Sequence, residues 1–396
     1  MRLAVLSSHP IQYYAPVFRL LAEQKGLALK VFYGWKGAAE GTVDPGFAAT
    51  ITWDIPLLGG YEHEFVPNAA KEPGTQHFRG IDLPTLPDRI AAWRPEALLV
   101  VGWCWKAHLA ALRHFHGRLP ILFRGDSTLL DERPGPRTLT RRLWLRWVYG
   151  HVDVALYVGT RNRDYYLAHG LKPGQLVFAP HAIDNQRFRQ NAGEMEAKAA
   201  TWRSTVGISP DQVAFLSAGK LEPKKAPDFL VSAFKSVQAN GSSSLALVFC
   251  GSGVLERGLR ERAGAGMHFL GFRNQSEMPW VYRVGDVVVL PSRGPGETWG
   301  LALNEAMACG RPVIASDKAG AAVDLIEQGR NGWVFPSGHL AALASVLQAA
   351  ERAGRSARAA MGKRSLEIIT PWSLERQVAG IVAGMNRATS AFRVRA

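Results

Sequence analysis

Short apolar runs alternate with helix-length segments along most of the chain, and this alternation constrains the fold more than any other feature. In the N-terminal half we expect strands at residues 3–6, 27–33, 97–101, 121–123, 152–158 and 176–178. The series then starts again, with strands expected at residues 213–218, 245–250, 267–270, 286–290, 313–315 and 333–335. Strands that alternate with helices form parallel sheets covered on both faces. The sequence therefore predicts an α/β fold with two doubly wound, Rossmann-like domains in tandem.

The apolar pattern breaks after Phe188, where a polar, Ala-rich segment begins. This break predicts a first domain over residues 1–190, a linker over 191–205 and a second domain over 206–368. Residues 369–396 read as a helix that packs back towards the first domain, followed by a basic tail. Open parallel sheets bind ligands at the carboxyl ends of their strands, so two such domains are expected to hold a ligand in the cleft between them. A long Pro- and Gly-rich stretch over residues 34–83 is expected near an active site or an acceptor surface.

The charge balance narrows the kinds of partner. The chain has 396 residues, with 47 Lys and Arg against 33 Asp and Glu, which gives a net charge of +14. A basic surface favours nucleic acid, acidic lipid or a phosphorylated substrate. Three cysteines, an odd number at long spacings, fit neither a disulfide framework nor a zinc site. The sequence shows no signal-peptide pattern and no apolar stretch long enough to cross a bilayer, so we expect a cytoplasmic protein.

The stretch over residues 290–316 carries the clearest chemistry. A strand ends there, a Gly- and Pro-rich loop follows, and a helix opens near Gly300. The first amides of a helix have no intrahelical acceptor and can bind an anion such as a diphosphate. Glu297 stands at the lip of the loop, where an ionised carboxylate can accept hydrogen bonds from two hydroxyls, and Glu305 lies within the helix. From spacing alone, a solvated loop residue and an ordinary helix residue explain the two acids equally well.

A second cluster, Gly219-Lys220-Leu-Glu-Pro-Lys224-Lys225, directly follows an expected strand. Cations at the carboxyl end of a parallel strand can stabilise the charge of a departing diphosphate. A solvated basic turn is the commoner explanation of such a run. The Gly251-Ser252-Gly253 turn after the next strand permits close approach of a ligand, although a plain tight turn explains it as well.

The residues from Pro291 to Val313 resemble the Glu-x7-Glu signature of family 4 glycosyltransferases, enzymes with the GT-B architecture. The resemblance implies a retaining transferase that uses a nucleotide diphosphate sugar, with UDP or GDP as the nucleotide, and no resident cofactor. It implies that Glu297 contacts the transferred sugar, that Lys220 and Lys225 assist the leaving diphosphate, and that Glu305 binds the ribose. The remaining donor-binding positions implied by the resemblance are Gly251, Arg273, Thr298, Trp299, Gly300 and Leu301. Residues 1–190 would then bind the acceptor and residues 206–368 the donor.

The first domain departs from the family pattern. Where relatives place a histidine after the strand at residues 121–123, this chain has Arg124-Gly125-Asp126. We expect Asp126 to take over the role at the reacting sugar, although Asp is also a common helix cap. His9 is expected to face the cleft, with a hydrogen-bonded turn histidine as the alternative. His108, His114 and His116 lack paired carboxylate or Cys ligands at metal-binding spacing, so no metal site is predicted.

Four arginines, Arg137, Arg141, Arg142 and Arg146, share one segment with Leu139, Leu143 and Trp147. On a helix the three apolar residues form a stripe with Arg142 and Arg146 beside it, a pattern able to lie on an anionic membrane. A core-packing stripe with a solvated basic flank explains the pattern equally well. If the first explanation holds, the enzyme works at the inner face of the cytoplasmic membrane, on a glycan or lipid-linked sugar acceptor in envelope or exopolysaccharide assembly.

Two other functions remain open from the sequence. A sugar-nucleotide epimerase or a phosphorylase can be built on the same two-domain frame. A basic nucleic-acid-binding protein would explain the net charge, but the chain has no recognised nucleic-acid motif and no interleaved aromatic stacking platform, so nucleic acid is not the expected partner.

Overall fold

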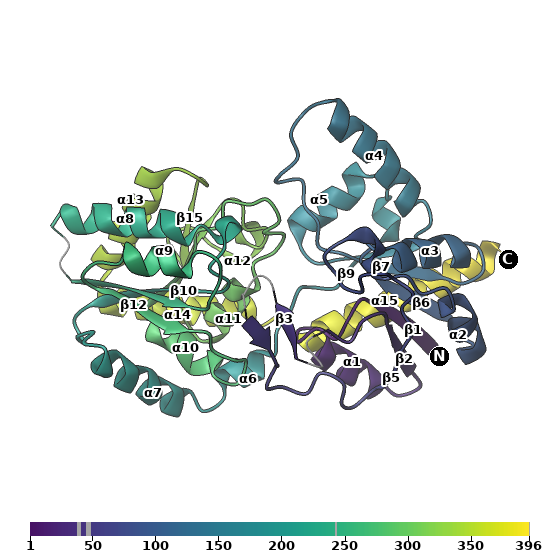
Figure 1. Ribbon diagram of the computed structural model, residues 1–396, viewed down its shortest axis with the longest axis horizontal. Coiled ribbons are helices and arrows are strands. Elements are labelled where there is room, and N and C mark those ends of the chain that lie inside the picture. Colours follow the sequence, from purple (N-terminus) through teal and green to yellow (C-terminus); the bar gives the residue numbers. More distant parts are fainter. Residues whose placement is uncertain (38–40, 45–48, 242–243, 396) are drawn as a thin grey trace. The chain divides into compact units, whose positions relative to one another are not determined.

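The computed structural model describes residues 1–37, 41–44, 49–241 and 244–395, and Figure 1 shows its elements in chain order. The chain forms two compact units, each with a parallel sheet and a core of its own. Unit 1 contains Met1–Thr42, Ile51–His181 and Leu374–Ala396, and unit 2 contains Val43–Thr50 and Ala182–Ser373. The prediction of two doubly wound α/β domains is confirmed.

Unit 1 is built on a seven-stranded sheet in the order β5-β2-β1-β6-β7-β8-β9, with every neighbouring pair parallel. Its strands are β1 (Arg2–Ser7), β2 (Ala28–Tyr33), β5 (Glu62–Phe65), β6 (Ala97–Val101), β7 (Ile121–Arg124), β8 (Val154–Tyr157) and β9 (Leu176–Phe178). The central strands are buried on both faces, which explains their uninterrupted apolar runs.

Helices flank this sheet. They are α1 (Ala15–Ala22), α2 (Leu86–Trp93), α3 (Lys106–Phe115), α4 (Pro136–Tyr149), α5 (Thr160–Ala168) and α15 (Leu374–Arg395), with short 3-10 turns η2 (Phe78–Gly80) and η3 (Pro173–Gln175). Figure 1 shows α4 standing out from the rest of the unit. Only the end of α4 that carries Leu145, Val148 and Tyr149 is buried in the core of unit 1.

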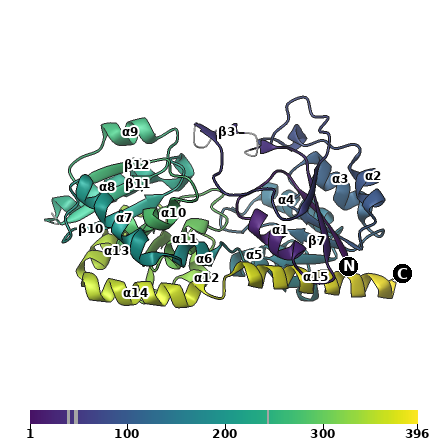
Figure 2. The same ribbon diagram turned by 90° about the horizontal axis from the view of Figure 1, so that it is seen from below.

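Helix α15 comes after the whole of unit 2 in the chain but packs on unit 1, beside α1, β8 and β9 (Figure 2). Two glycines bring it against the sheet. A Cβ on Gly380 would collide with the carbonyl oxygen of Phe178, and one on Gly384 would lie 2.6 Å from the side chain of Leu156. Residues 369–396, expected to return towards the first domain, thus contain a helix of that unit.

Unit 2 has a six-stranded sheet in the order β12-β11-β10-β13-β14-β15, again parallel throughout. The strands are β10 (Val213–Ala218), β11 (Leu245–Cys250), β12 (Met267–Gly271), β13 (Val287–Leu290), β14 (Val313–Ser316) and β15 (Gly332–Phe335). Its helices are α6 (Asn185–Arg189), α7 (Ala192–Thr205), α8 (Pro227–Ala239), α9 (Glu256–Glu261), α10 (Met278–Val284), α11 (Leu301–Ala308), α12 (Ala322–Leu325), α13 (Leu340–Arg352) and α14 (Gly354–Ile369), with a 3-10 turn η4 (Pro223–Lys225).

Residues 191–205, expected to be a linker, instead form α7, and the units divide between His181 and Ala182 rather than at residue 190. Helix α7 buries little more than Ala199, so its sequence lacks the apolar stripe that would reveal a packed helix. Polar contacts hold it instead. Arg203 forms an ion pair with Asp286 at 3.0 Å, and the Lys198 ammonium lies 5.0 Å from the ring centre of Trp280.

The stretch over residues 34–83 is partly ordered by secondary structure that the sequence did not predict. It contributes β5 to the edge of the unit 1 sheet and a two-stranded sheet of β3 (Thr42–Asp44) and β4 (Ala49–Ile51). Residues 38–40 and 45–48 of this stretch lie outside the described residues. The side chain of Asn68 ties the rest together, because its amide donates to Gly34 O and Gly80 O at 3.1 and 2.9 Å. Its proximity to an active site or acceptor surface stays a prediction.

Candidate functional site

The predicted donor-side residues of unit 2 follow two strands that lie side by side. β10 pairs with β13 in parallel, so the loops after them leave the same edge of the sheet. The loop after β10 carries Lys220 and Lys225, and the loop after β13 carries Glu297. A backbone hydrogen bond of 2.9 Å from Arg293 N to Lys224 O joins the two loops.

This junction brings Lys225 and Glu297 together. Lys225 Nζ lies 2.5 Å from Glu297 Oε2, and the Ser292 hydroxyl donates to the same oxygen at 2.8 Å. Glu297 is 7% exposed and the Lys225 side chain is 23% exposed. An ionised carboxylate of this kind is acceptor-only and is suited to ligand hydroxyls. The two predicted residues are therefore partners inside unit 2, and Ser292 is a third member that the sequence did not single out.

The first turn of α11 begins where predicted, at Gly300, which is the residue before Leu301. Gly300 has φ 100°, a conformation that favours glycine, and a Cβ there would lie 2.7 Å from Leu290 Cδ2, so the Leu290 side chain would have to shift. The Leu303 amide donates to Gly300 O at 2.9 Å, and amides at the start of a helix, ahead of this bond, are able to bind an anion. The ring of Trp299 is buried: its Nε1 donates to Asn304 Oδ1 at 2.9 Å and it packs on Trp372. Any contact of Trp299 with a ligand would thus use its backbone.

Glu305 lies within α11 and is buried. The hydroxyl of Tyr282, on α10, donates to Glu305 Oε2 at 2.6 Å. This contact fixes the carboxylate from the neighbouring helix. No local pattern around Glu305 marks Tyr282, which lies 23 residues earlier, as its partner.

The other predicted donor-side residues have contacts of their own. A Cβ on Gly251 would collide with the carbonyl oxygen of Gly219, so this glycine is required by the packing of neighbouring strand ends. Arg273 is half-buried, and its Nη1 lies 3.3 Å from Glu277 Oε1 while its Nε donates to Leu270 O at 3.2 Å. Lys220 is half-buried beside Gly219. Thr298 and Leu301 are half-buried at the start of α11.

In unit 1, the predicted residues follow the strands β1 and β7. His9 lies just after β1, with its Nδ1 2.9 Å from the Ser8 hydroxyl and its ring in edge contact with Trp35. Asp126 follows β7 and is half-buried, and its Oδ2 lies 3.6 Å from His181 Nε2. His181 follows β9 and was not among the predicted site residues. The structure thus places an imidazole from the segment after β9 beside Asp126, which itself lies on the segment where relatives are expected to have histidine.

Burial of His181 lowers the pKa of its imidazole, and the hydrogen bond with Asp126 opposes that shift. Beneath this pair, the guanidinium of Arg124 is fully buried. It donates to Ala179 O and Pro180 O at 2.6 and 3.1 Å and to the Tyr14 hydroxyl at 3.2 Å. Arg124 therefore holds the backbone just before His181 in place. An arginine inside an apolar strand gave no sequence signal of this role.

Within residues 1–37, 41–44, 49–241 and 244–395, no group of three or more His, Cys, Asp or Glu side chains is arranged to hold a metal ion. All three cysteines are free thiols. Over the same residues, no helix combines the length and apolar character needed to cross a bilayer.

Comparison with known proteins identifies the class of this chain. The sequence model described as "Glycosyl transferases group 1" matches residues 198–367, which lie inside unit 2. The D-inositol 3-phosphate glycosyltransferase of Rhodococcus opacus is 28% identical over 380 residues, covering 86% of this chain and 80% of the relative. D-inositol 3-phosphate glycosyltransferase 2 of Catenulispora acidiphila is 31% identical over 201 residues, covering 46% of this chain and 45% of the relative.

Solved structures share the fold over nearly the whole chain. HepE of Anabaena, solved in complex with UDP, superposes with a TM-score of 0.73 at 16% identity, over 98% of this chain and 100% of its own. WaaG, a glycosyltransferase involved in lipopolysaccharide biosynthesis, gives a TM-score of 0.68 at 16% identity, over 96% of this chain and 100% of its own. The match over residues 198–367, the relatives and the shared fold agree on a glycosyltransferase with the GT-B architecture.

Proposed function

We propose that this glycosyltransferase moves a sugar from a nucleotide diphosphate sugar to a hydroxyl acceptor with retention at the anomeric carbon, in the assembly of a cell-envelope glycan or exopolysaccharide. The observation that carries the proposal is the ion pair of buried Glu297 and half-buried Lys225 after the strands β13 and β10 of unit 2. It lies within the part of the chain that the group 1 sequence model matches. UDP or GDP is the proposed nucleotide, and the UDP complex of HepE supports the first of these.

In the proposed mechanism, the first amides of α11 bind the diphosphate and the ammonium groups of Lys220 and Lys225 stabilise the charge that develops on it. The contact with Glu297 holds the Lys225 ammonium in place at the proposed site. The Glu297 carboxylate, held by Ser292 as well, accepts hydrogen bonds from hydroxyls of the transferred sugar. Glu305, fixed by Tyr282, is proposed to accept from the ribose. Gly251, Arg273 and the backbone of Thr298, Trp299 and Gly300 complete the proposed donor site.

On the acceptor side we propose Asp126 and His9. The contact between Asp126 and His181 supports this assignment, because a neighbouring imidazole orients the carboxylate and can share a proton with it. D-inositol 3-phosphate is the acceptor that the names of several relatives give, and a lipid-linked sugar is the acceptor that the basic surface favours. The proposed place of action is the cytoplasm, at the inner face of the membrane.

The test is a thermal-shift panel with UDP, GDP, ADP, CDP and dTDP. A ligand at about 100 times its dissociation constant stabilises by about 2.7 kcal/mol, enough to detect. We expect one nucleotide to raise the melting temperature, Lys220→Ala to remove the shift, and Lys363→Ala, an exposed lysine on α14, to leave it unchanged. A shift that survives Lys220→Ala, or equal shifts with all five nucleotides, contradicts the proposed site.

Product analysis tests the reaction. Incubation of the donor that emerges from the panel with lipid-linked sugar or D-inositol 3-phosphate should yield a glycosylated acceptor with the anomeric configuration of the donor. Conversion of the donor without any acceptor would instead indicate the epimerase alternative, and inverted product would refute retention.

A further inference from the structure

Helix α4 has two apolar faces, and unit 1 covers one of them. Leu145, Val148 and Tyr149 point into the core of the unit. The opposite face exposes large apolar side chains at positions one helical turn apart: Leu139 is 62% exposed, Leu143 59%, Trp144 39% and Trp147 45%. The stripe seen in the sequence is thus an outward face rather than a core contact. Exposed apolar groups gathered in this way mark an interaction surface.

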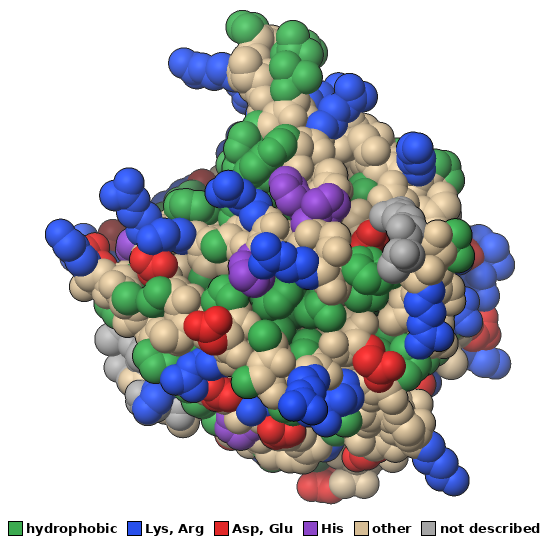
Figure 3. All heavy atoms as spheres, turned by 90° about the vertical axis from the view of Figure 1, so that its right-hand side faces the viewer, with side chains coloured by type: hydrophobic (Ala, Val, Ile, Leu, Met, Phe, Trp, Pro, Cys, Tyr) green, Lys and Arg blue, Asp and Glu red, His purple; other side chains and the backbone are tan. Residues whose placement is uncertain are grey.

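Arginines border the stripe on both sides. At about 100° per residue, Arg142 and Arg146 follow one edge of the apolar face, and Arg137 and Arg141 follow the other. Figure 3 shows hydrophobic and basic side chains together on the protruding part of the molecule at its top. Between Asp131 and Tyr149 the chain has five arginines and two acids. The surface is therefore apolar in its middle and cationic at its margins.

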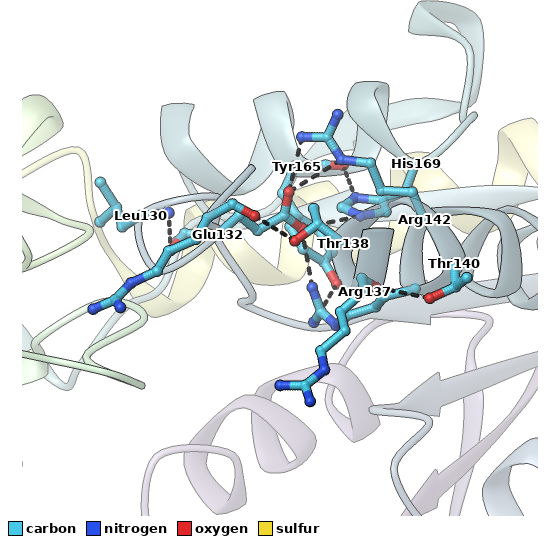
Figure 4. Close-up of polar contacts among 11 residues, drawn as sticks. Leu130, Glu132, Arg137, Thr138, Thr140, Arg142, Tyr165 and His169 are labelled. Carbon is cyan, nitrogen blue, oxygen red and sulfur yellow. Dashed lines mark hydrogen bonds and ion pairs between the residues drawn. The ribbon is translucent and has the colours of Figure 1, made fainter. Parts of the chain in front are cut away.

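The two acids of this segment do not neutralise all the arginines along the two edges of the apolar face. Glu132 is 11% exposed and its carboxylate binds Arg141 at 3.0 Å and Arg142 at 2.8 Å, with His169 Nε2 at 3.3 Å (Figure 4). This cluster fastens α4 to the end of α5. Arg137 and Arg146 form no ion pair with an acid within the described part of the chain. They are the two arginines left to meet an external anion.

A cavity adjoins one edge of this surface. Its volume is about 560 Å³, and its lining includes Arg146, Lys172 and His116 together with Asp153. The Asp153 carboxylate accepts from the Ile121 amide at 2.8 Å and is thus partly satisfied within the unit. Because Arg146 belongs both to the edge of the stripe and to the lining, an anion in the cavity would lie beside the exposed apolar residues.

We propose that the outer face of α4 docks on an anionic lipid bilayer. Leu139, Leu143 and the two tryptophans enter the interfacial region, where aromatic side chains with one polar edge are favoured. Arg137 and Arg146 bind lipid phosphates, and the cavity beside Arg146 receives a headgroup. Charge complementarity selects this partner, because basic residues at the rim of an apolar face are attracted to anionic lipid. Self-association through the same face would bring rows of arginines together.

Docking rests on α4 and its neighbours in unit 1, and it does not depend on the donor site in unit 2. The two proposals can therefore fail separately. If docking holds, the protein is brought to acceptors that are themselves anchored in a membrane.

The experiment is flotation of the full-length protein with phosphatidylcholine vesicles, with and without phosphatidylglycerol. We expect binding to the anionic vesicles and little to the neutral ones. Arg137→Gln with Arg146→Gln should lower the partition coefficient about 30-fold, since each basic residue near such a surface contributes about 1 kcal/mol. Leu139→Ser with Leu143→Ser should lower it at least about tenfold. Raising NaCl from about 0.1 to 1 M, which shortens the Debye length from about 10 to 3 Å, should release the protein.

Matched controls lie in unit 2. Val254→Ser with Val323→Ser removes two exposed apolar residues, and Arg257→Gln with Arg330→Gln removes two exposed charges. Losses in the α4 variants no larger than in these controls overturn the proposal, as does equal binding to neutral and anionic vesicles. A dimer in sedimentation analysis that Leu139→Ser with Leu143→Ser dissociates would assign the face to a second copy instead. Because all four α4 residues are exposed, circular dichroism and the nucleotide-induced thermal shift should be unchanged in every variant.

Discussion

Replacing Lys225 by Met would leave the Glu297 carboxylate inside unit 2 without its cation. Glu297 is 7% exposed, and after the substitution the Ser292 hydroxyl, at 2.8 Å, would remain as its hydrogen-bond donor. Leaving a buried polar group without a partner costs about 1–3 kcal/mol, and a charged group lies at the upper end. The 23% exposure of Lys225 shows that water reaches one side of the pair, so the about 3–5 kcal/mol of a fully buried ion pair is not expected. We predict a loss of about 2 kcal/mol.

Replacing the other partner of the ion pair, Glu297, should lower the stability by less. Glu297→Gln keeps the shape and a hydrogen-bond acceptor for Ser292, and the ammonium of Lys225 can turn to water. We expect a loss below about 1 kcal/mol, as for partly exposed ion pairs. The double variant removes both charges and should resemble Glu297→Gln more than Lys225→Met. Its loss should therefore be smaller than the sum of the two single losses.

Calorimetry and circular dichroism of thermal unfolding measure these differences. A domain of this size shifts its melting temperature by about 2–4 °C per kcal/mol, so Lys225→Met should lower it by about 4–8 °C. Lys363→Met, on the exposed surface of α14, is the matched control and should change nothing. A smaller loss for Lys225→Met than for Glu297→Gln, or strictly additive losses in the double variant, would refute the asymmetry worked out from the exposures.

Three further predictions follow from backbone conformation and burial. Ala226 has φ 49°, in the left-handed region, so Ala226→Gly should relieve backbone strain by slightly more than the added freedom of glycine in the unfolded chain costs. We expect a net gain in stability of about 0.5 kcal/mol, measured as a rise of about 1–2 °C in melting temperature. A fall in melting temperature would contradict this. Gly300→Ala adds a collision with Leu290 to an unfavourable φ and should cost about 1–3 kcal/mol in urea unfolding, whereas Gly296→Ala, with φ 91° and open space, should cost less. Burial lowers the pKa of His108 from 6.5 to about 4, so the unfolded chain binds a proton that the folded protein does not as the pH falls through this window. Stability is therefore full above about pH 6.5 and about 3 kcal/mol lower near pH 4, and His108→Leu should flatten the dependence of melting temperature on pH; an equal dependence in the variant would exclude His108 as its source.

The sequence predicts most strands of both sheets because their runs are apolar on both faces. β5 is not predicted from the sequence because it is an edge strand in which Glu alternates with aromatic residues. It is stabilised by Lys30, whose ammonium lies 3.2 and 2.9 Å from the carboxylates of Glu62 and Glu64. α7 is not predicted because polar contacts, and not an apolar stripe, hold this helix against the rest of unit 2. In both cases the stabilising partner is remote in the chain, and no local pattern reveals it.

The candidate site shows the same limit. The motif marks Glu297 and Lys225 separately, but the two lie far apart in sequence and meet only because β10 and β13 are neighbours in the sheet. Likewise the pattern of α4 contains two apolar faces, one through Leu143 and one through Val148, and periodicity cannot tell which one the core covers. Strand order and the position of the sheet decide both questions.

The return of α15 to unit 1 makes that unit discontinuous, and this has a consequence for biosynthesis. Gly380 and Gly384 allow the helix to pack closely on the strands of a sheet whose other segments precede Ala182–Ser373, the main segment of unit 2. During translation, the face that α15 covers stays open until the roughly two hundred residues of unit 2 have been made. Unit 2, in contrast, is nearly continuous and can fold as soon as it emerges. The nascent chain should therefore complete its second unit first and close its first unit last, which makes the uncovered sheet face the natural binding site for a chaperone.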